Sequence, residues 1–196
     1  MALLVGLTGG IGAGKSTALR ELEALGQQVL DTDSVVHELY SPGTPVVEAL
    51  CRRYGTAIID AEGRINRRRL ADLAFSSSKE LRWLNQLVHP HVKQRMFAAA
   101  DSADGLIFCA VPLLFEVGWE DDVACVVVIW CDGETQRGRL KDRGWSIDEL
   151  VRRQSAQLPM DEKLVRADYA VINNSSIDVL QRQLQKIICR IQERLA

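Results

Sequence analysis

Short apolar runs alternate along the chain with longer segments in which apolar residues recur every three or four positions. The apolar runs cover residues 3–7, 28–30, 106–111, 123–130 and 169–172. A polar or glycine-containing turn follows each run. Short buried strands that alternate with helices are typical of parallel βαβ units, in which helices cover both faces of the sheet. The pattern therefore predicts an α/β domain built on a parallel sheet.

Helical periodicity fills the segments between these runs. We expect helices at residues 15–26, 34–40, 45–53, 67–76, 79–99, 134–143, 146–157 and 177–194. The last has the clearest pattern, because Leu180, Leu184 and Ile191 belong to a series of apolar residues spaced three or four apart. Such an amphipathic helix packs its apolar stripe against one face of a sheet.

Two segments are too long to be simple connections between strands. Residues 31–105 separate the second strand from the third and contain several helices, whereas ordinary connections are far shorter. A second helical segment, rich in Arg and Gln, separates the fourth strand from the fifth. We therefore expect one core with two helical inserts: core residues 1–33, 105–133 and 168–196, a first insert 34–104 and a second insert 134–167.

Composition excludes several classes of partner. Hydrophobic residues make up 47% of the chain and charged residues 26%, and the net charge of -2 gives no general attraction to nucleic acid or anionic membranes. No apolar run approaches the roughly 20 residues of a membrane span, and the first residues do not resemble a signal peptide. We expect a cytoplasmic monomer or weak homo-oligomer that binds small molecules, with neither nucleic acid nor membrane as partner.

The glycine-rich segment after the first strand carries the strongest chemical signal. Residues 9–16, GGIGAGKS, match G-x-x-x-x-G-K-[ST] between a strand and a helix, as the phosphate loop requires. Glycines let backbone N–H groups converge on phosphate oxygens at a helix N-terminus, where the helix dipole also favours an anion. We expect Lys15 to reach the β- and γ-phosphates, Ser16 to bind Mg²⁺ and Thr17 to meet the α-phosphate. A glycine turn without a ligand is the weaker alternative.

Two carboxylates follow the second strand. The segment LDTDS, residues 30–34, places Asp31 and Asp33 at the carboxyl end of a parallel strand, where open α/β sheets bind ligands. We expect Asp33 to accept the proton of the substrate hydroxyl. The alternative is that Asp33 caps a helix that begins at Ser34. Asp31 is expected to be structural or linked to Mg²⁺.

Both inserts carry basic residues. Gln136, Arg139 and Arg143 share one helical face, which either closes over ATP or faces solvent. The first insert has a cluster of four arginines, Arg64, Arg67, Arg68 and Arg69, and the sequence His89-Pro90-His91, which together suit an anionic acceptor. The alternative for His89 is a cap before a helix that starts at the proline. The histidines lack the spacing of metal ligands, so no zinc site is expected.

These residues resemble one family over the whole chain, the dephospho-CoA kinases. The resemblance rests on seven ordered blocks: VGLTGGIGAGKST (5–17), LDTDSVVHELY (30–40), GRINRRRLADLAF (63–75), LNQLVHPHV (84–92), VPLLFE (111–116), TQRGRLKDRGWS (135–146) and ADYAVINN (167–174). It implies phosphorylation of the 3'-hydroxyl of dephospho-coenzyme A with MgATP, the last step of coenzyme A synthesis. It also implies a P-loop NTPase three-layer fold with a five-stranded parallel sheet, a helical acceptor (CoA) subdomain and a helical lid.

The resemblance also implies roles for individual residues. The catalytic set is Asp33, Lys15 and Arg139. The ATP-binding set is Gly10, Ile11, Gly12, Ala13, Gly14, Lys15, Ser16, Thr17, Arg143 and Asn173, with Asn173 near the adenine. The acceptor-binding set is Asp33, Arg67, His89, Pro90, Leu113, Leu114 and Glu116. The metal ligand is Ser16.

Three positions depart from the family pattern. The third strand, LIFCAVP, has no acid where phosphate-loop enzymes usually place a Mg²⁺ ligand, so water or Asp33 is expected to supply that contact. Asn66 stands where an Asp is expected, and Trp145 replaces a small polar or acidic residue in the lid. Two alternatives stay open: another small-molecule or nucleoside monophosphate kinase, and a non-catalytic ATP-binding regulatory module.

Overall fold

A computed structural model describes residues 2–142, 144, 154–155 and 157–195. The predicted Arg143 and most of the predicted helix 146–157 lie outside these described residues. The chain forms two compact units, one of Met1–Asp31 with Ala99–Ala196 and the other of Thr32–Ala98.

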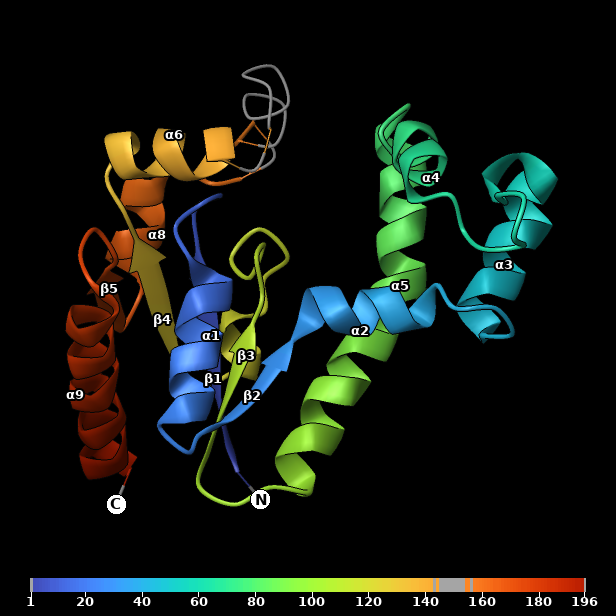
Figure 1. Cartoon of the computed structure of the whole chain (residues 1–196). Helices are drawn as coiled ribbons and strands as arrows, with labels where there is room; N and C mark the ends of the chain where they lie inside the picture. The colour runs from blue at the N-terminus through green and yellow to red at the C-terminus, as the bar shows by residue number, and fades with distance from the viewer. Residues whose placement is uncertain (1, 143, 145–153, 156, 196) are drawn as a thin grey trace. The chain divides into compact units, whose positions relative to one another are not determined.

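The first unit is built on one parallel sheet, visible in Figure 1. Its strands are β1 (Leu3–Gly9), β2 (Gln28–Asp31), β3 (Leu106–Ala110), β4 (Cys125–Trp130) and β5 (Tyr169–Ile172). Their order is β2-β3-β1-β4-β5, and every neighbouring pair is parallel. The prediction of a five-stranded parallel sheet is confirmed. Because β1 is central, the loop that follows it leaves the sheet at its middle.

Four helices accompany this sheet among the residues of the first unit that the structure describes. They are α1 (Lys15–Ala24), α6 (Gly133–Asp142), α8 (Met160–Arg166) and α9 (Ile177–Leu195). α1 and α9 contact each other, and their side chains Leu22, Leu184 and Ile191 are almost fully buried with those of β1 and β4. Each such buried side chain contributes about 1.5–3 kcal/mol relative to exposure. The amphipathic pattern predicted for the last helix is confirmed.

The second unit is helical. It contains α2 (Thr32–Leu39), α3 (Pro45–Tyr54), a short 3-10 turn η1 (Gly55–Ile58), α4 (Arg67–Ala74) and most of α5 (Ser78–Asp101). Side chains cap two of these helices: Thr44 accepts from the N–H of Val47, and Asn66 accepts from the N–H of Arg69. Asn is as good a cap as Asp, so Asn66 fulfils the structural requirement of its position. None of the described helices in either unit has both the length and the apolarity that a membrane span needs.

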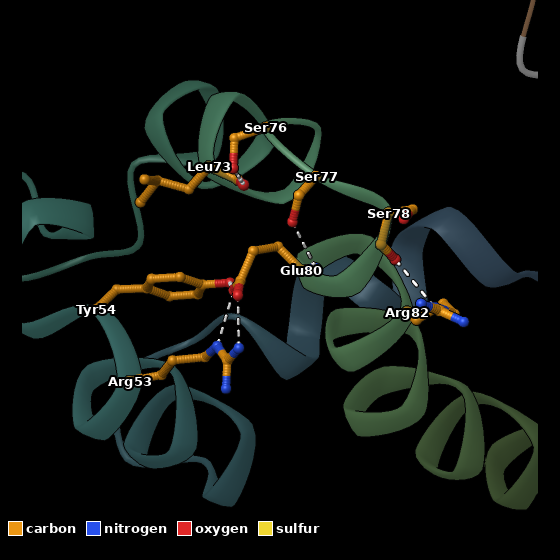
Figure 2. Close-up of polar contacts among 8 residues, drawn as sticks. All are labelled: Arg53, Tyr54, Leu73, Ser76, Ser77, Ser78, Glu80 and Arg82. Carbon is orange, nitrogen blue, oxygen red and sulfur yellow. Dashed lines mark hydrogen bonds and ion pairs between the residues drawn. The ribbon is translucent and has the colours of Figure 1, made fainter.

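One polar cluster ties α3 to the start of α5 (Figure 2). Arg53 donates to both carboxylate oxygens of Glu80, at 2.8 and 2.6 Å, and the Tyr54 hydroxyl donates to Glu80 at 2.6 Å. The Arg53 guanidinium also stacks 4.3 Å from the centre of the Trp83 ring. The bonds from Arg53 and then from Tyr54 lower the pKa of Glu80 to about 2. The cluster therefore depends on an ionised Glu80.

Candidate active site

The loop between β1 and α1 has a backbone that glycine makes possible. Gly12 and Gly14 have φ angles of 72° and 98°, in the left-handed region that other residues rarely adopt. Gly14 is also the N-cap of α1, with no side-chain cap. Because glycine has no side chain, this N-cap residue cannot bind the first N–H groups of α1, and such a helix N-terminus suits an anion.

Lys15 lies across this loop. Its Nζ donates to the carbonyl oxygens of Gly9, at 2.8 Å, and Gly10, at 3.0 Å. Ser16 is exposed at the start of α1, and Thr17 is half-buried beside it. The predicted ATP-binding residues from Gly10 to Thr17 therefore form the loop after β1 and the first turn of α1.

Side chains from distant segments hold the carbonyl oxygens of the loop. Gln136 Nε2 donates to the carbonyl of Ile11 at 2.7 Å, and Asn173 Nδ2 donates to that of Ala13 at 2.8 Å. Arg139 donates to the carbonyls of Gly12 and Ala13, at 3.4 and 3.2 Å. Because C=O and the next N–H point in opposite directions across a trans peptide, the N–H that follows each of these carbonyls points away from the side chain that holds the carbonyl.

This arrangement decides one alternative left open by the sequence. Gln136 and Arg139 face the phosphate loop, so the hypothesis that their helical face is only solvated is wrong. Arg139 also donates to the carbonyl of Asn173 at 2.9 Å, and Asn173 is 4% exposed. Asn173 thus supports the loop through the carbonyl of Ala13, while its predicted place near the adenine stays a prediction.

A pocket adjoins the loop. It has a volume of about 310 Å³, and its lining includes Gly10 and Ile11 of the loop, Gln136 of α6, and Met160 and Lys163 of α8. Binding pockets for small molecules start at about this size. The pocket is therefore the candidate nucleotide site of the first unit.

The loop after β3 contains three predicted acceptor residues. Leu114 is fully buried and packs toward Gly6 of β1, whereas Leu113 is 37% exposed. Leu113 is therefore the leucine that a ligand can reach. Glu116 forms an ion pair with Lys163 at 2.7 Å. Sequence reasoning missed Lys163, because α8 has only seven residues and is too short for a periodic pattern.

The two aspartates after β2 lie in different units. Asp31 is the last residue of β2 and pairs with Ala110 of β3. α2 already begins at Thr32, so Asp33 lies inside its first turn and is exposed. The alternative that Asp33 caps a helix from Ser34 is therefore wrong, because the helix begins before it.

A groove of about 520 Å³ runs along one side of α5 in the second unit. Its lining includes Arg82, Gln86, His89, Pro90 and Lys93. Burial, and then the charge of Lys93, lower the pKa of His89 below its usual 6.5, so its neutral form dominates at pH 7. The helix continues through Pro90, so the alternative that His89 caps a helix starting there is wrong. Pro90 lacks an N–H, which leaves the carbonyl of Gln86 without its helical bond.

The arginines near α4 differ in their surroundings. Arg64 is paired with Asp60 at 3.3 Å and with Glu62 at 3.1 Å, so its charge is compensated locally. Arg67 is exposed at the first position of α4, and its charge opposes the rise that burial causes in the pKa of Tyr40. Of these two cations, Arg67 is the better placed to meet an anionic ligand.

The family model and the curated relatives name the same family. The family model described as CoaE, dephospho-CoA kinase, matches residues 3–178. The dephospho-CoA kinase of Symbiobacterium thermophilum is 37% identical over 187 residues, which is 93% of this chain and 78% of that protein. The crystal structure of TT1252 from Thermus thermophilus is similar, with a TM-score of 0.85, 33% identity, and 96% of this chain and 97% of that chain covered. A dephospho-CoA kinase from Campylobacter jejuni shares the fold at 21% identity, with a TM-score of 0.70 over 100% of both chains.

Proposed function

The chain belongs to the dephospho-CoA kinase family, which makes it a P-loop kinase of coenzyme A biosynthesis, and we propose that Asp33 is the base of its reaction. Asp33 would accept the proton of the 3'-hydroxyl of dephospho-coenzyme A as that oxygen attacks the γ-phosphate of ATP. ADP leaves, and coenzyme A is the other product. The exposure of Asp33 in the first turn of α2 supports this role, because a substrate can reach its carboxylate.

Binding of the ATP phosphates falls to the phosphate loop. Its backbone N–H groups would surround the β-phosphate, and Lys15 would leave the carbonyls of Gly9 and Gly10 to meet the β- and γ-phosphates. Arg139 would contribute by holding the loop through Gly12 and Ala13, and it reaches the transferring phosphoryl group only if it releases these carbonyls.

The donor set fits a Mg²⁺ ion that arrives with the nucleotide. Among the described residues, no group of three His, Cys, Asp or Glu side chains could hold a metal ion. Mg²⁺ commonly binds through one or two protein oxygens, with phosphates and waters as its other ligands. The exposed Ser16 hydroxyl would be the protein ligand, and the ion would neutralise charge on the β- and γ-phosphates.

The groove on α5 is proposed to bind the acceptor. Dephospho-coenzyme A carries a diphosphate, and Arg82 and Lys93 supply positive charge at the groove. A neutral His89 offers a hydrogen bond rather than a third charge. Arg67 and Leu113 remain further proposed contacts. We also propose that the protein is cytoplasmic and acts as a monomer or weak homo-oligomer.

The observation that carries the proposal is a phosphate loop whose carbonyl oxygens accept hydrogen bonds from Gln136, Arg139 and Asn173. The test is ADP release from MgATP with dephospho-CoA, AMP, CMP, dTMP, shikimate or no acceptor, with mass spectrometry of each product. We expect one phosphate to be added to dephospho-CoA alone. Transfer to another acceptor would contradict the assigned acceptor groove, and ADP release without any acceptor would contradict the role of Asp33.

A further inference from the structure

A buried ion pair beside the nucleotide pocket has no role in the reaction as proposed above. Lys163 of α8 has 1% of its side chain exposed and Glu116 has 13%, and Nζ lies 2.7 Å from Oε1. A pair removed from water in this way is costly to disrupt, because the remaining charge has no compensation. The pair therefore fixes the two segments that carry it relative to each other.

Two oxygen atoms next to Lys163 each accept two hydrogen bonds. Glu116 Oε1 accepts from the backbone N–H of Leu158, at 2.8 Å, as well as from Lys163. The carbonyl of Pro112 accepts from Lys163 at 3.5 Å and from the Thr8 hydroxyl at 3.3 Å. Thr8 is the penultimate residue of β1, directly before the glycine-rich segment. Lys163 thus links α8 to the loop after β3, and Thr8, from the strand that leads into the phosphate loop, binds the same carbonyl of that loop.

The same segment forms part of the pocket. Leu158, Met160 and Lys163 line it together with Gly10 and Ile11. A shift of residues 158–163 would therefore change the wall that faces the phosphate loop.

We propose that the Glu116–Lys163 pair is a latch that positions residues 158–163 as a wall of the ATP pocket. The proposal rests on the proposed function, since it takes this pocket to be the nucleotide site. Glu116 and Lys163 are positioning residues, because they act through the segment they hold. The latch gives Glu116 a role in ATP binding instead of the acceptor contact expected from its sequence position.

The first test uses the two variants that each remove one charge, Lys163→Met and Glu116→Gln. Each leaves a buried partner uncompensated, so the melting temperature falls and the segment loses its anchor. We expect the KM for ATP to rise roughly threefold to tenfold in both variants, with the KM for dephospho-CoA unchanged. Lys141→Met, which removes an exposed lysine of α6, is the matched control and should change neither quantity.

A double variant separates positioning from stability alone. Glu116→Gln with Lys163→Met leaves no uncompensated charge, so its melting temperature should rise above those of the single variants. Its KM for ATP should stay raised, because the latch is still absent. Lys163→Arg keeps the positive charge and can still donate to Glu116, so it should return the KM for ATP toward the wild-type value.

Three results would overturn the latch. One is a double variant that regains both the melting temperature and the wild-type KM for ATP, which makes the pair purely structural. Another is a folded single variant with an unchanged KM for ATP. The third is a rise in the KM for dephospho-CoA alone, which would mean that Glu116 contacts the acceptor, as the sequence predicts. If the single variants do not fold, the KM for ATP of the double variant and of Lys163→Arg tests the latch instead. The wild-type protein, assayed in parallel, tests the proposed function separately, because that function fails only if the wild type does not phosphorylate dephospho-CoA.

Discussion

The phosphate loop, residues 9–16, and the groove on α5, residues 82–93, present binding groups of different kinds. The loop offers backbone N–H groups whose direction is fixed, because side chains from α6 and the end of β5 hold its carbonyls. The groove offers long side chains, Arg82 and Lys93 among them, along one side of a single helix. Backbone groups cannot be changed by substitution, whereas each groove residue can.

The difference has a consequence for specificity. A loop that binds through backbone groups recognises phosphate in any nucleotide, because every nucleoside triphosphate presents the same oxygens. Selection of the acceptor must then come from side chains. Variants of the loop and of the side chains that support it should therefore change the binding or turnover of ATP. Variants of the groove should change the binding of the acceptor.

Among variants of the two regions compared, Lys15→Ala should have the largest effect and would sharpen the comparison. Lys15 is the one cation within the loop motif itself, and without it turnover should fall roughly 10³-fold or more. The melting temperature should change little, because the side chain is only half-buried. Steady-state kinetics and thermal unfolding check this prediction, with Lys141→Ala as control. An unfolded Lys15→Ala protein would contradict it.

Asn173→Ala tests whether the loop depends on its supports. The change removes one of two donors to the buried carbonyl of Ala13, which keeps its bond from Arg139, at a cost of about 0.5–1.5 kcal/mol. The KM for ATP should rise about tenfold, and the KM for dephospho-CoA should stay constant. Asn174→Ala, at the exposed neighbouring position, is the control. A normal KM for ATP would show that the loop holds its shape unaided.

Lys93→Ala tests the groove. The loss of one positive charge should raise the KM for dephospho-CoA by about threefold to tenfold, with the KM for ATP unchanged. Arg95→Ala removes a cation from the same helix, but Arg95 pairs with Glu38 of α2 and does not line the groove. A larger effect in Arg95→Ala than in Lys93→Ala would contradict the assignment of the groove.

Glu80→Gln should have the smallest effect, confined to the second unit and dependent on pH. The pKa of Glu80 in the folded protein is about 2, below the usual 4.5, so its ionised form stabilises the fold above the usual pKa. This contribution is lost as the pH falls from about 4.5 toward 2. The melting temperature of Glu80→Gln should lie below that of the wild type at pH 7, and the two should converge near pH 2. A constant difference would contradict the cluster.

The sequence predicts the sheet, the phosphate loop and α9, because each has a local signal. Alternating apolar runs mark strands, the spacing of Gly14 and Lys15 marks the loop, and a long apolar stripe marks the last helix. The supports of the loop lack such a signal. Asn173 is 160 residues from Ala13 along the chain, so their contact depends on the order of the strands.

Pro90 and Lys163 show where local rules fail. Proline normally interrupts a helix, but Val88, Val92 and Met96 are buried on both sides of Pro90 and keep α5 continuous. Lysine is almost never fully buried without a partner, and the partner, Glu116, belongs to a loop rather than to the same helix. In both cases packing between distant segments overrides the preference of the single residue.

Asp33→Asn tests the central claim most directly, measured as ATP binding and turnover on the same preparation. The substitution keeps the size and the polarity of the side chain but removes its capacity to take the proton. We expect nearly unchanged ATP affinity and a turnover lower by about 10²–10⁴-fold. Turnover equal to that of the wild type would contradict the role of Asp33 as base.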